Sequence, residues 1–175
     1  SSKICFDLNA ACTGYIQALS TVFSIMHTKS QFSRAMIISA DRGIKLAERQ
    51  SGKEELIFSD GIVATFFEKN NTKGWSLVAE DHQSFPEDKN LIKVEEGAFS
   101  CPQVKASISL NGPLVFSRAV KAMKKSIENV LDQARLNITD IDYIIPHQGN
   151  FNITKRLMKD LNLETDKVYS GISNW

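Results

Sequence analysis

The sequence has few cysteines, no long apolar run and no excess of charge of one sign, and each feature excludes a class of protein. Its three cysteines are Cys5, Cys12 and Cys101. They form neither CxxC pairs nor Cys/His ligand spacings, which argues against structural zinc and a disulfide framework and fits a reducing cytoplasm. No run of about 18 apolar residues is available for a membrane span, and the first residues lack a signal-peptide pattern. The 21 basic and 20 acidic side chains give a net charge of +1, so no overall attraction to nucleic acid or to a membrane surface is expected.

The composition suits a folded globular chain. Its 175 residues correspond to about one domain, and the 42% of hydrophobic residues supply a sizeable core. The chain begins with Ser1-Ser2-Lys3 and stops at Trp175, directly after an apolar stretch that is typical of a strand. We therefore expect these residues to form a segment of a longer protein.

The spacing of apolar residues changes between strand-like and helix-like along the chain. The apolar run at residues 34–41 is continuous, which is typical of a strand buried on both faces of a parallel sheet. Because strand patterns alternate with helical patterns, we expect a mostly parallel α/β sheet. Strands are expected at residues 4–9, 34–41, 61–69, 75–82, 140–146 and 167–173, and helices at residues 14–27, at residues 113–136 and, capped by Asn152 or Thr154, up to Leu161.

The polar stretches between these elements are expected to be loops. Residues 42–59 form one such loop, and residues 83–107 form a long connection with room for short strands. The pairs Asp60-Gly61 and Asn111-Gly112 are expected to form tight turns.

Cys12 lies where the first expected strand gives way to a helix. The amide hydrogens and positive dipole end of a first helical turn would stabilise the thiolate and lower the pKa of the thiol. The small neighbours Ala10, Ala11 and Gly14 would let a substrate carbonyl approach. The Cys12 amide hydrogen could then point at the oxyanion that forms on attack. The alternative interpretation is a small apolar residue that packs a turn, since free cysteines are usually buried and inert.

His147 follows Pro146 at the expected end of a strand, where the backbone is constrained. An imidazole there can donate a hydrogen bond to developing negative charge and can accept a proton, and Cys plus His is an acyl-transfer pairing. Ligands bind at the carboxyl ends of strands in such sheets, so we expect Cys12 and His147 to face one pocket. The alternative is a loop histidine that is hydrogen-bonded for structure. His27 and His82 are expected to face solvent.

Four stretches of the sequence together resemble one family. In colinear order across essentially the whole chain, they are similar to β-ketoacyl-acyl-carrier-protein synthase III and its relatives in the thiolase fold. The resemblance implies a partial thiolase-like α/β fold. Residues 1–105 would be the later part of its first half, with the nucleophilic cysteine, and residues 106–175 the start of its second half, with the catalytic histidine. The four stretches are DLNAACTGYIQAL at 7–19, SDGIVATFFE at 59–68, LNGPLVFSRAV at 110–120 and IIPHQGNFNI at 144–153.

The resemblance also implies an enzyme, a condensing acyltransferase of fatty acid or related lipid or polyketide biosynthesis. Cys12 would take an acyl group from acyl-coenzyme A. A malonyl thioester on acyl carrier protein would then be decarboxylated with the help of His147, and the carbanion would attack the acyl-enzyme to give a 3-oxoacyl product. A cytoplasmic homodimer is implied, with coenzyme A and phosphopantetheine thioesters as substrates and no metal or other cofactor. The family's third catalytic group, an asparagine in a Gly-Asn-Thr-Ser-like turn, would lie beyond Trp175, and Asn174 is not assigned that role.

The sequence departs from the family at two positions near the expected substrate tunnel. Asn152 stands where the family commonly has an arginine for phosphopantetheine or the carrier protein. Gly112-Pro113 stands where Gly-Asn is usual, which removes a side-chain amide and a backbone donor. We expect Gly112, Asn150 and Asn152 to be substrate-binding candidates, and Asn150 could also fix the His147 ring or hold a water. Both departures favour a specialised synthase with another acyl donor or acceptor.

Three alternatives stay open at this point. The acyl group on Cys12 could pass to an alcohol or an amine instead of a malonyl carbanion. The chain could also be a non-catalytic thiolase-fold subunit, although such a subunit needs neither Cys12 nor His147. An unrelated cysteine hydrolase would usually place a third orienting group on the histidine, and none is evident in the sequence.

Overall fold

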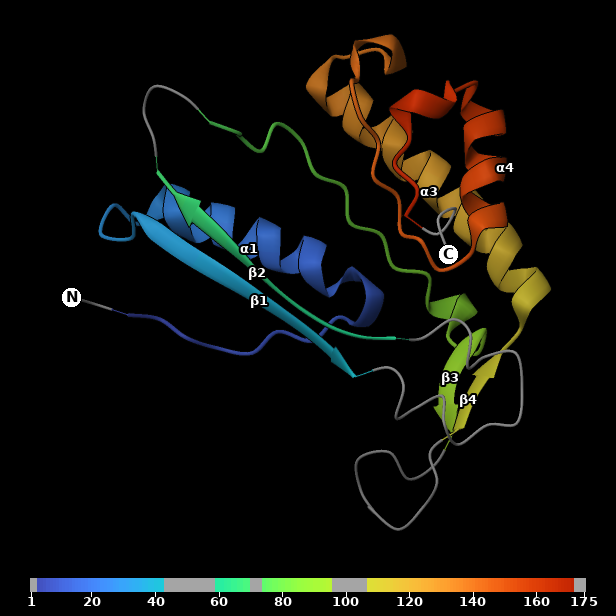
Figure 1. The fold of residues 1–175 in the computed structure, drawn as a ribbon, viewed down its shortest axis with the longest axis horizontal. Coiled ribbons are helices and arrows are strands. Elements are labelled where there is room, and N and C mark those ends of the chain that lie inside the picture. The colour runs from blue at the N-terminus through green and yellow to red at the C-terminus, as the bar shows by residue number, and fades with distance from the viewer. Residues whose placement is uncertain (1–2, 43–58, 70–73, 96–106, 172–175) are drawn as a thin grey trace. The chain divides into compact units, whose positions relative to one another are not determined.

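The computed structural model describes residues 3–42, 59–69, 74–95 and 107–171 (Figure 1). The chain forms two compact units. The first contains the described stretches up to Arg42 and from Asp60 to Glu80, and the second contains those from Asp81 onward. Cys101, Asn174, the expected domain boundary between residues 105 and 106 and most of the expected loop at 42–59 lie outside the described residues. None of the described helices combines the length and the apolar character needed to cross a membrane.

The first unit is a helix on a two-stranded sheet. Its elements are the 3-10 turn η1 (Ala11–Thr13), helix α1 (Gly14–Thr28) and strands β1 (Arg34–Arg42) and β2 (Asp60–Glu68). The expected helix and both of these expected strands are confirmed, but β1 and β2 pair antiparallel, with Ile37 opposite Thr65. The expectation of a parallel sheet is wrong for these strands, because a continuous apolar run does not specify the direction of its neighbour. Asp60 and Gly61 are paired inside β2, so the turn expected there is also wrong.

One face of the β1–β2 sheet is covered by α1. Ile37 on β1 and Met26 on α1 are buried. The rings of Phe23 on α1 and Phe67 on β2 meet edge to face, with centroids 5.9 Å apart. Tyr15 and Thr65 share a hydrogen bond between their hydroxyl oxygens at 3.2 Å. The helix that begins directly after Cys12 is therefore fixed to the sheet along its length.

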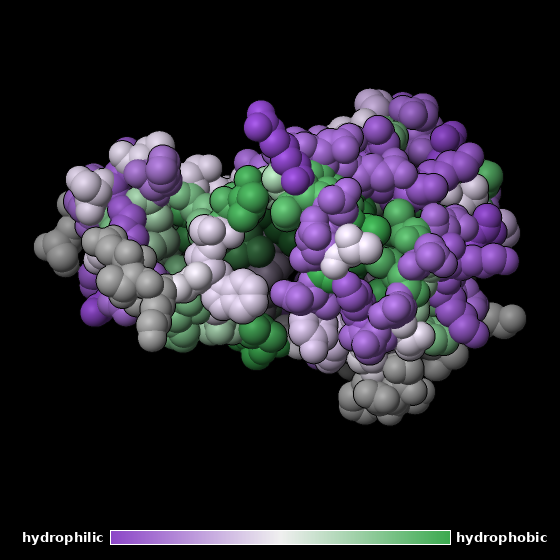
Figure 2. Space-filling model, turned by 90° about the horizontal axis from the view of Figure 1, so that it is seen from above, coloured by the Kyte–Doolittle hydropathy of each residue, from purple (hydrophilic) through white to green (hydrophobic). Residues whose placement is uncertain are grey.

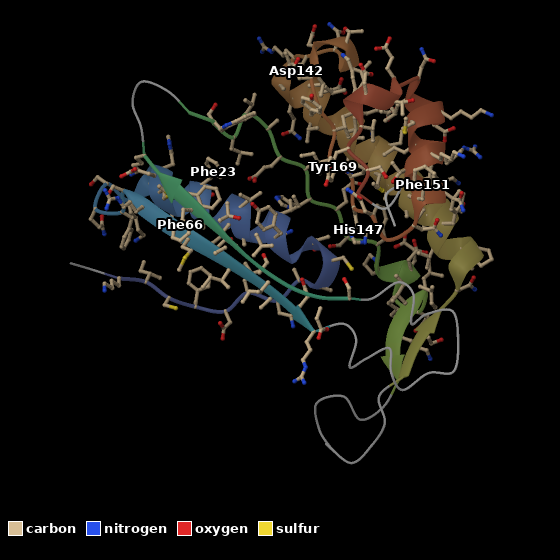
Figure 3. All side chains as sticks on the ribbon, in the orientation of Figure 1. Phe23, Phe66, Asp142, His147, Phe151 and Tyr169 are labelled. Carbon is tan, nitrogen blue, oxygen red and sulfur yellow. The ribbon has the colours of Figure 1, made fainter. Side chains whose placement is uncertain are left out.

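The opposite face of the same sheet is apolar and exposed. Side chains alternate between the faces of a strand, so the neighbours of Ile37 and Phe67 point away from α1. Phe66 is 76% exposed and Met36, which lies opposite it, is 49% exposed. The labelled Phe66 and Phe23 lie on β2 and α1 in Figure 3. β1 is thus covered on one face only, and the expectation of burial on both faces is wrong for the described residues. An apolar face of this kind is typical of an interface.

Two further expected strands do not form in the described part of the chain. Residues 4–9 and 75–82 carry no strand among the described residues. Ile4 and Phe6 are more than half exposed. A strand needs a neighbour to receive its backbone hydrogen bonds, and alternation in the sequence does not supply one.

The second unit contains two longer helices and a short sheet. β3 (Ile92–Glu95) and β4 (Ser107–Leu110) pair antiparallel, with Ile92 opposite Leu110. β3 lies inside the connection expected at residues 83–107, and β4 begins at its last residue. Helices α3 and α4 contact each other and confirm the two helices expected in this part of the chain (Figure 1). From the side drawn in Figure 2, hydrophilic side chains dominate the surface of this unit. Its elements are η3 (Pro86–Asp88), β3 (Ile92–Glu95), β4 (Ser107–Leu110), α3 (Gly112–Ala134), η4 (Ile138–Asp140), α4 (Phe151–Leu161) and η5 (Thr165–Lys167).

Two expected strands of this unit are reduced to one bridge. Ile144 and Val168 form an isolated parallel bridge. The Ile144 amide donates to the Lys167 carbonyl at 2.8 Å, and the Tyr169 amide donates to the Ile144 carbonyl at 3.0 Å. The pairing is in the expected parallel direction but, among the described residues, spans one residue of each segment; residues 172–173 of the second expected strand lie outside them. Val168 is buried, as are Val120 of α3 and Leu157 of α4.

Asp81 lies in the second unit and gives it an acid-sensitive contact. Its carboxylate accepts hydrogen bonds from the side-chain amides of Asn129, at 2.9 Å, and of Gln83, at 2.6 Å. These bonds hold the pKa of Asp81 below its usual value, because they favour the charged form. The bond from Asn129 has the largest effect. The contact therefore stabilises the fold above the usual aspartate pKa, and this contribution is lost as the pH falls through the lowered pKa.

We expect Asn129→Ala to raise the pKa of Asp81 toward its usual value, because the hydrogen bond that lowers this pKa most is removed. The measurement is a carboxyl-carbon NMR titration of Asp81, with Gln83→Ala as the matched variant and a smaller rise expected for it. An unchanged pKa in Asn129→Ala would contradict this account.

Candidate functional site

Cys12 lies in the middle of η1, immediately before α1 begins at Gly14. Its side chain is exposed, so the packing interpretation of this cysteine is wrong for this structure. The turn is held by local hydrogen bonds: the Ala11 amide donates to Asn9 Oδ1 at 3.2 Å, and the Thr13 hydroxyl donates to the Ala10 carbonyl at 2.8 Å. A thiol is thereby presented at the start of a helix.

The residue before the thiol adopts a left-handed backbone conformation. Ala11 has φ of +46°, in a region that a residue with a Cβ rarely occupies. Such a conformation costs of the order of 1–3 kcal/mol and is found most often at functional sites. The run of small residues before Cys12 explains why the turn is possible, since a larger side chain would crowd it further. The sequence signal was this run, but the backbone strain was not predicted.

His147 follows the buried Pro146 and is itself exposed, in the loop that leads into α4 (Figure 3). Its ring lies against the backbone of Gly149. A Cβ built on Gly149 would lie 3.0 Å from His147 Nε2, closer than most real Cβ contacts. The glycine therefore leaves room for this ring position, which could not be predicted from the residue types alone.

Asn150 is the N-cap of α4. Its backbone is extended, and its side-chain oxygen accepts the Asn152 amide at 2.9 Å. The caps expected at Asn152 or Thr154 are wrong, because Asn152 is the second residue of the helix and Thr154 is buried within it. Asn150 stands three residues after His147, so the cap fixes the end of the loop that carries the imidazole.

We expect Asn150→Ala to lower the free energy of unfolding by about 1 kcal/mol, the usual cost of losing a side-chain cap. Asn150→Asp keeps an acceptor and should retain most of the stability. Urea unfolding of both variants checks this. If Asn150→Ala were as stable as the wild-type protein, the cap would not stabilise α4.

Gly112 and Asn152 occupy the first turns of two different helices. Gly112 is the first residue of α3, and a Cβ built on it would meet no atom within 4 Å. Asn111 caps this helix by accepting the Leu114 amide at 3.4 Å. The tight turn expected at Asn111-Gly112 is therefore a helix start, and Asn followed by Gly-Pro was the signal that could have found it. Substrate binding by Gly112, Asn150 and Asn152 stays a prediction.

The structure brings some of the predicted residues together and leaves others apart. His147, Asn150 and Asn152 share the junction between one loop and α4, and Gly112 lies in the same unit. Cys12 lies in the first unit. The shared pocket for Cys12 and His147 stays a prediction.

Other titratable side chains of the described stretches offer no competing centre. Groups of three or more His, Cys, Asp or Glu side chains that could hold a metal ion are not found there. His27, in the last turn of α1, and His82 are both exposed, as expected. A second histidine site is therefore not indicated in this part of the chain.

Comparison with known proteins matches two segments of the chain to one family. Residues 6–85 match 3-oxoacyl-[acyl-carrier-protein] synthase III, and residues 131–174 match the C-terminal part of the same synthase. A β-ketoacyl-[acyl-carrier-protein] synthase III of Clostridium acetobutylicum is 33% identical over 180 residues, which cover 98% of this chain and 54% of the relative. The same synthase of Clostridium novyi is 31% identical, with coverage of 98% and 54%. The chain thus spans about half the length of the curated relatives it matches.

Solved structures of 3-oxoacyl-(acyl carrier protein) synthase III have a fold similar to that of this chain. A 3-oxoacyl-(acyl carrier protein) synthase III from Pseudomonas aeruginosa superposes with a TM-score of 0.80 at 24% identity, over 95% of this chain and 51% of that protein. The synthase from Aquifex aeolicus gives a TM-score of 0.79 at 26% identity, over 95% and 51%. The expected partial thiolase-like α/β fold is confirmed.

Proposed function

Because this chain belongs to the 3-oxoacyl-[acyl-carrier-protein] synthase III family, we propose that the protein is a condensing acyltransferase that primes fatty acid or related biosynthesis. The acyl donor is acyl-coenzyme A, and the acceptor is a malonyl thioester on acyl carrier protein. The observation that carries the proposal is the exposed Cys12 at a strained turn that opens α1, inside a segment matched by this family.

In the first step, the Cys12 thiolate attacks the thioester carbonyl carbon. A carbon–sulfur bond forms to Cys12, and the bond to the coenzyme A sulfur breaks, so that coenzyme A leaves as a thiolate and takes a proton. Negative charge builds on the carbonyl oxygen during the attack, and backbone amide hydrogens at the start of α1 suit its stabilisation. A covalent acyl-enzyme divides one difficult reaction into two easier ones.

In the second step, the malonyl thioester loses carbon dioxide. The bond between its carboxylate and its α-carbon breaks, and the electron pair moves onto the thioester as an enolate. His147 donates a hydrogen bond to the enolate oxygen and so lowers the barrier. The α-carbon then forms a bond to the acyl carbon, and Cys12 leaves as a thiolate. The exposure of the His147 side chain supports this role, because an exposed imidazole is accessible to a substrate.

The test supplies the two substrates separately to the full-length protein. Incubation with a panel of acyl-coenzyme A chain lengths should add one acyl group to the peptide that contains Cys12, detected by mass spectrometry. Malonyl-acyl carrier protein should then release carbon dioxide and discharge the acyl group as a 3-oxoacyl product. A thiol that stays unmodified with every chain length would overturn the proposal, and discharge without carbon dioxide would favour acyl transfer to an alcohol or an amine.

We also propose that the protein is a cytoplasmic homodimer that needs no metal or other cofactor. The location is supported by the sparse cysteines. The absence of a cofactor follows from the chemistry, since both steps use groups of the protein and the thioester substrates. The oligomeric state rests on the family resemblance.

A further inference from the structure

The loop that carries His147 is anchored at both ends. Before it, Ile144 forms the parallel bridge with Val168 through two backbone hydrogen bonds, of 2.8 Å to Lys167 and 3.0 Å from Tyr169. After it, Asn150 caps α4. The imidazole therefore emerges from a short stretch whose ends are fixed by a strand segment on one side and a helix on the other.

Gln148 adds an anchor inside this stretch. Its side-chain oxygen Oε1 accepts the Gly171 amide at 2.6 Å, and the contact is partly buried. Gly171 belongs to the segment that pairs with Ile144, so the same two pieces of chain are joined twice. A Cβ built on Gly171 would lie 3.4 Å from Gln148 Oε1, so the side chain of Gln148 lies directly against this glycine.

Gln148 lies in the sequence between His147 and Gly149, the glycine against which the His147 ring packs. The His147 ring packs against Gly149, with Nε2 at 3.0 Å from the position of a Gly149 Cβ. Because Gln148 is the residue between them, a shift of its backbone moves both the ring and its support. In Figure 3, the label His147 marks the loop, and the label Tyr169 marks the segment that pairs with Ile144.

We propose that Gln148 is a positioning residue, which clamps the His147 loop to the Val168–Gly171 segment and so sets the orientation of the imidazole. The inference rests on the function proposed above. Loss of this contact should affect decarboxylation more than acyl loading. Acyl loading uses Cys12, whereas decarboxylation needs a donor aimed at the enolate oxygen. A misplacement of about 1 Å at such a donor can cost roughly 100-fold in rate.

The test compares Gln148→Met and Gln148→Glu in the full-length protein. Methionine has a similar length without an oxygen acceptor, and glutamate keeps an oxygen for the Gly171 amide. Acyl loading of Cys12 is measured by mass spectrometry, and decarboxylation of malonyl-acyl carrier protein by release of labelled carbon dioxide. Hydrogen exchange of the Gly171 amide reports the clamp itself.

We expect Gln148→Met to load at a rate within about 2-fold of wild type and to lose roughly 10- to 100-fold in kcat for decarboxylation, with KM little changed. The Gly171 amide should exchange faster, and Gln148→Glu should restore slow exchange and most of the kcat. Wild-type decarboxylation in Gln148→Met, equal losses in loading and decarboxylation, or no recovery in Gln148→Glu would each overturn the clamp. A wild-type protein that neither loads nor decarboxylates would instead overturn the proposed function.

Discussion

Cys12→Ala is expected to abolish acyl loading and to lower condensation by roughly 1,000-fold or more, as removal of a nucleophile does in other enzymes with covalent intermediates. Alanine fills the same turn without a sulfur, so the strained backbone at Ala11 and the start of α1 should be kept. The measurement is the intact mass of the full-length protein after incubation with acyl-coenzyme A, together with the rate of 3-oxoacyl product formation.

Cys5→Ser is the matched control for this experiment. Cys5 is also exposed, but it lies in the segment before η1 and not at a helix start. It should load and condense like the wild-type protein. Loading of Cys12→Ala, or loss of loading in Cys5→Ser, would contradict the assignment of the nucleophile.

His147→Ala is expected to separate the two steps of the reaction. Acyl loading of Cys12 should continue at a rate within a few-fold of wild type, because the helix start supplies its own donors. Decarboxylation should fall by about 100- to 10,000-fold, which is the usual contribution of a positioned acid, base or donor. Release of labelled carbon dioxide from malonyl-acyl carrier protein measures this step.

His27→Ala serves as the control because His27 is exposed and lies in the last turn of α1. It should retain both steps. Equal loss of loading and decarboxylation in His147→Ala would point to a structural histidine, the alternative that the sequence left open.

The helices could be predicted from the sequence because a helix closes its own hydrogen bonds. The apolar spacing in residues 14–27 and 113–136 matches α1 and α3 closely. A strand depends on a partner, and residues 4–9 and 75–82 have the composition of strands without a ladder in the described residues. For the same reason the direction of the β1–β2 pairing was not predictable from either strand alone.

The residues of the candidate site also differ in how far the sequence alone could predict them. Cys12 and His147 could be proposed as catalytic candidates because their chemistry and neighbours are local: small residues precede the thiol, and a proline precedes the imidazole. The role of Asn150 as a cap and the contact of Gln148 with Gly171 depend on backbone geometry and on a segment more than twenty residues away. Residue types alone do not specify such contacts.

The claim on which the mechanism depends is that Cys12 and His147 face a common pocket, and a short bifunctional alkylating reagent tests it most directly. In dibromoacetone a single carbonyl carbon joins the two reactive carbons, so the reagent can bridge only side chains that lie very close together. Treatment of the full-length protein followed by peptide mass spectrometry should give a covalent bridge between Cys12 and His147, absent in Cys12→Ala and in His147→Ala. Alkylation of Cys12 without any bridge, or a bridge to His27 or His82, would contradict the account.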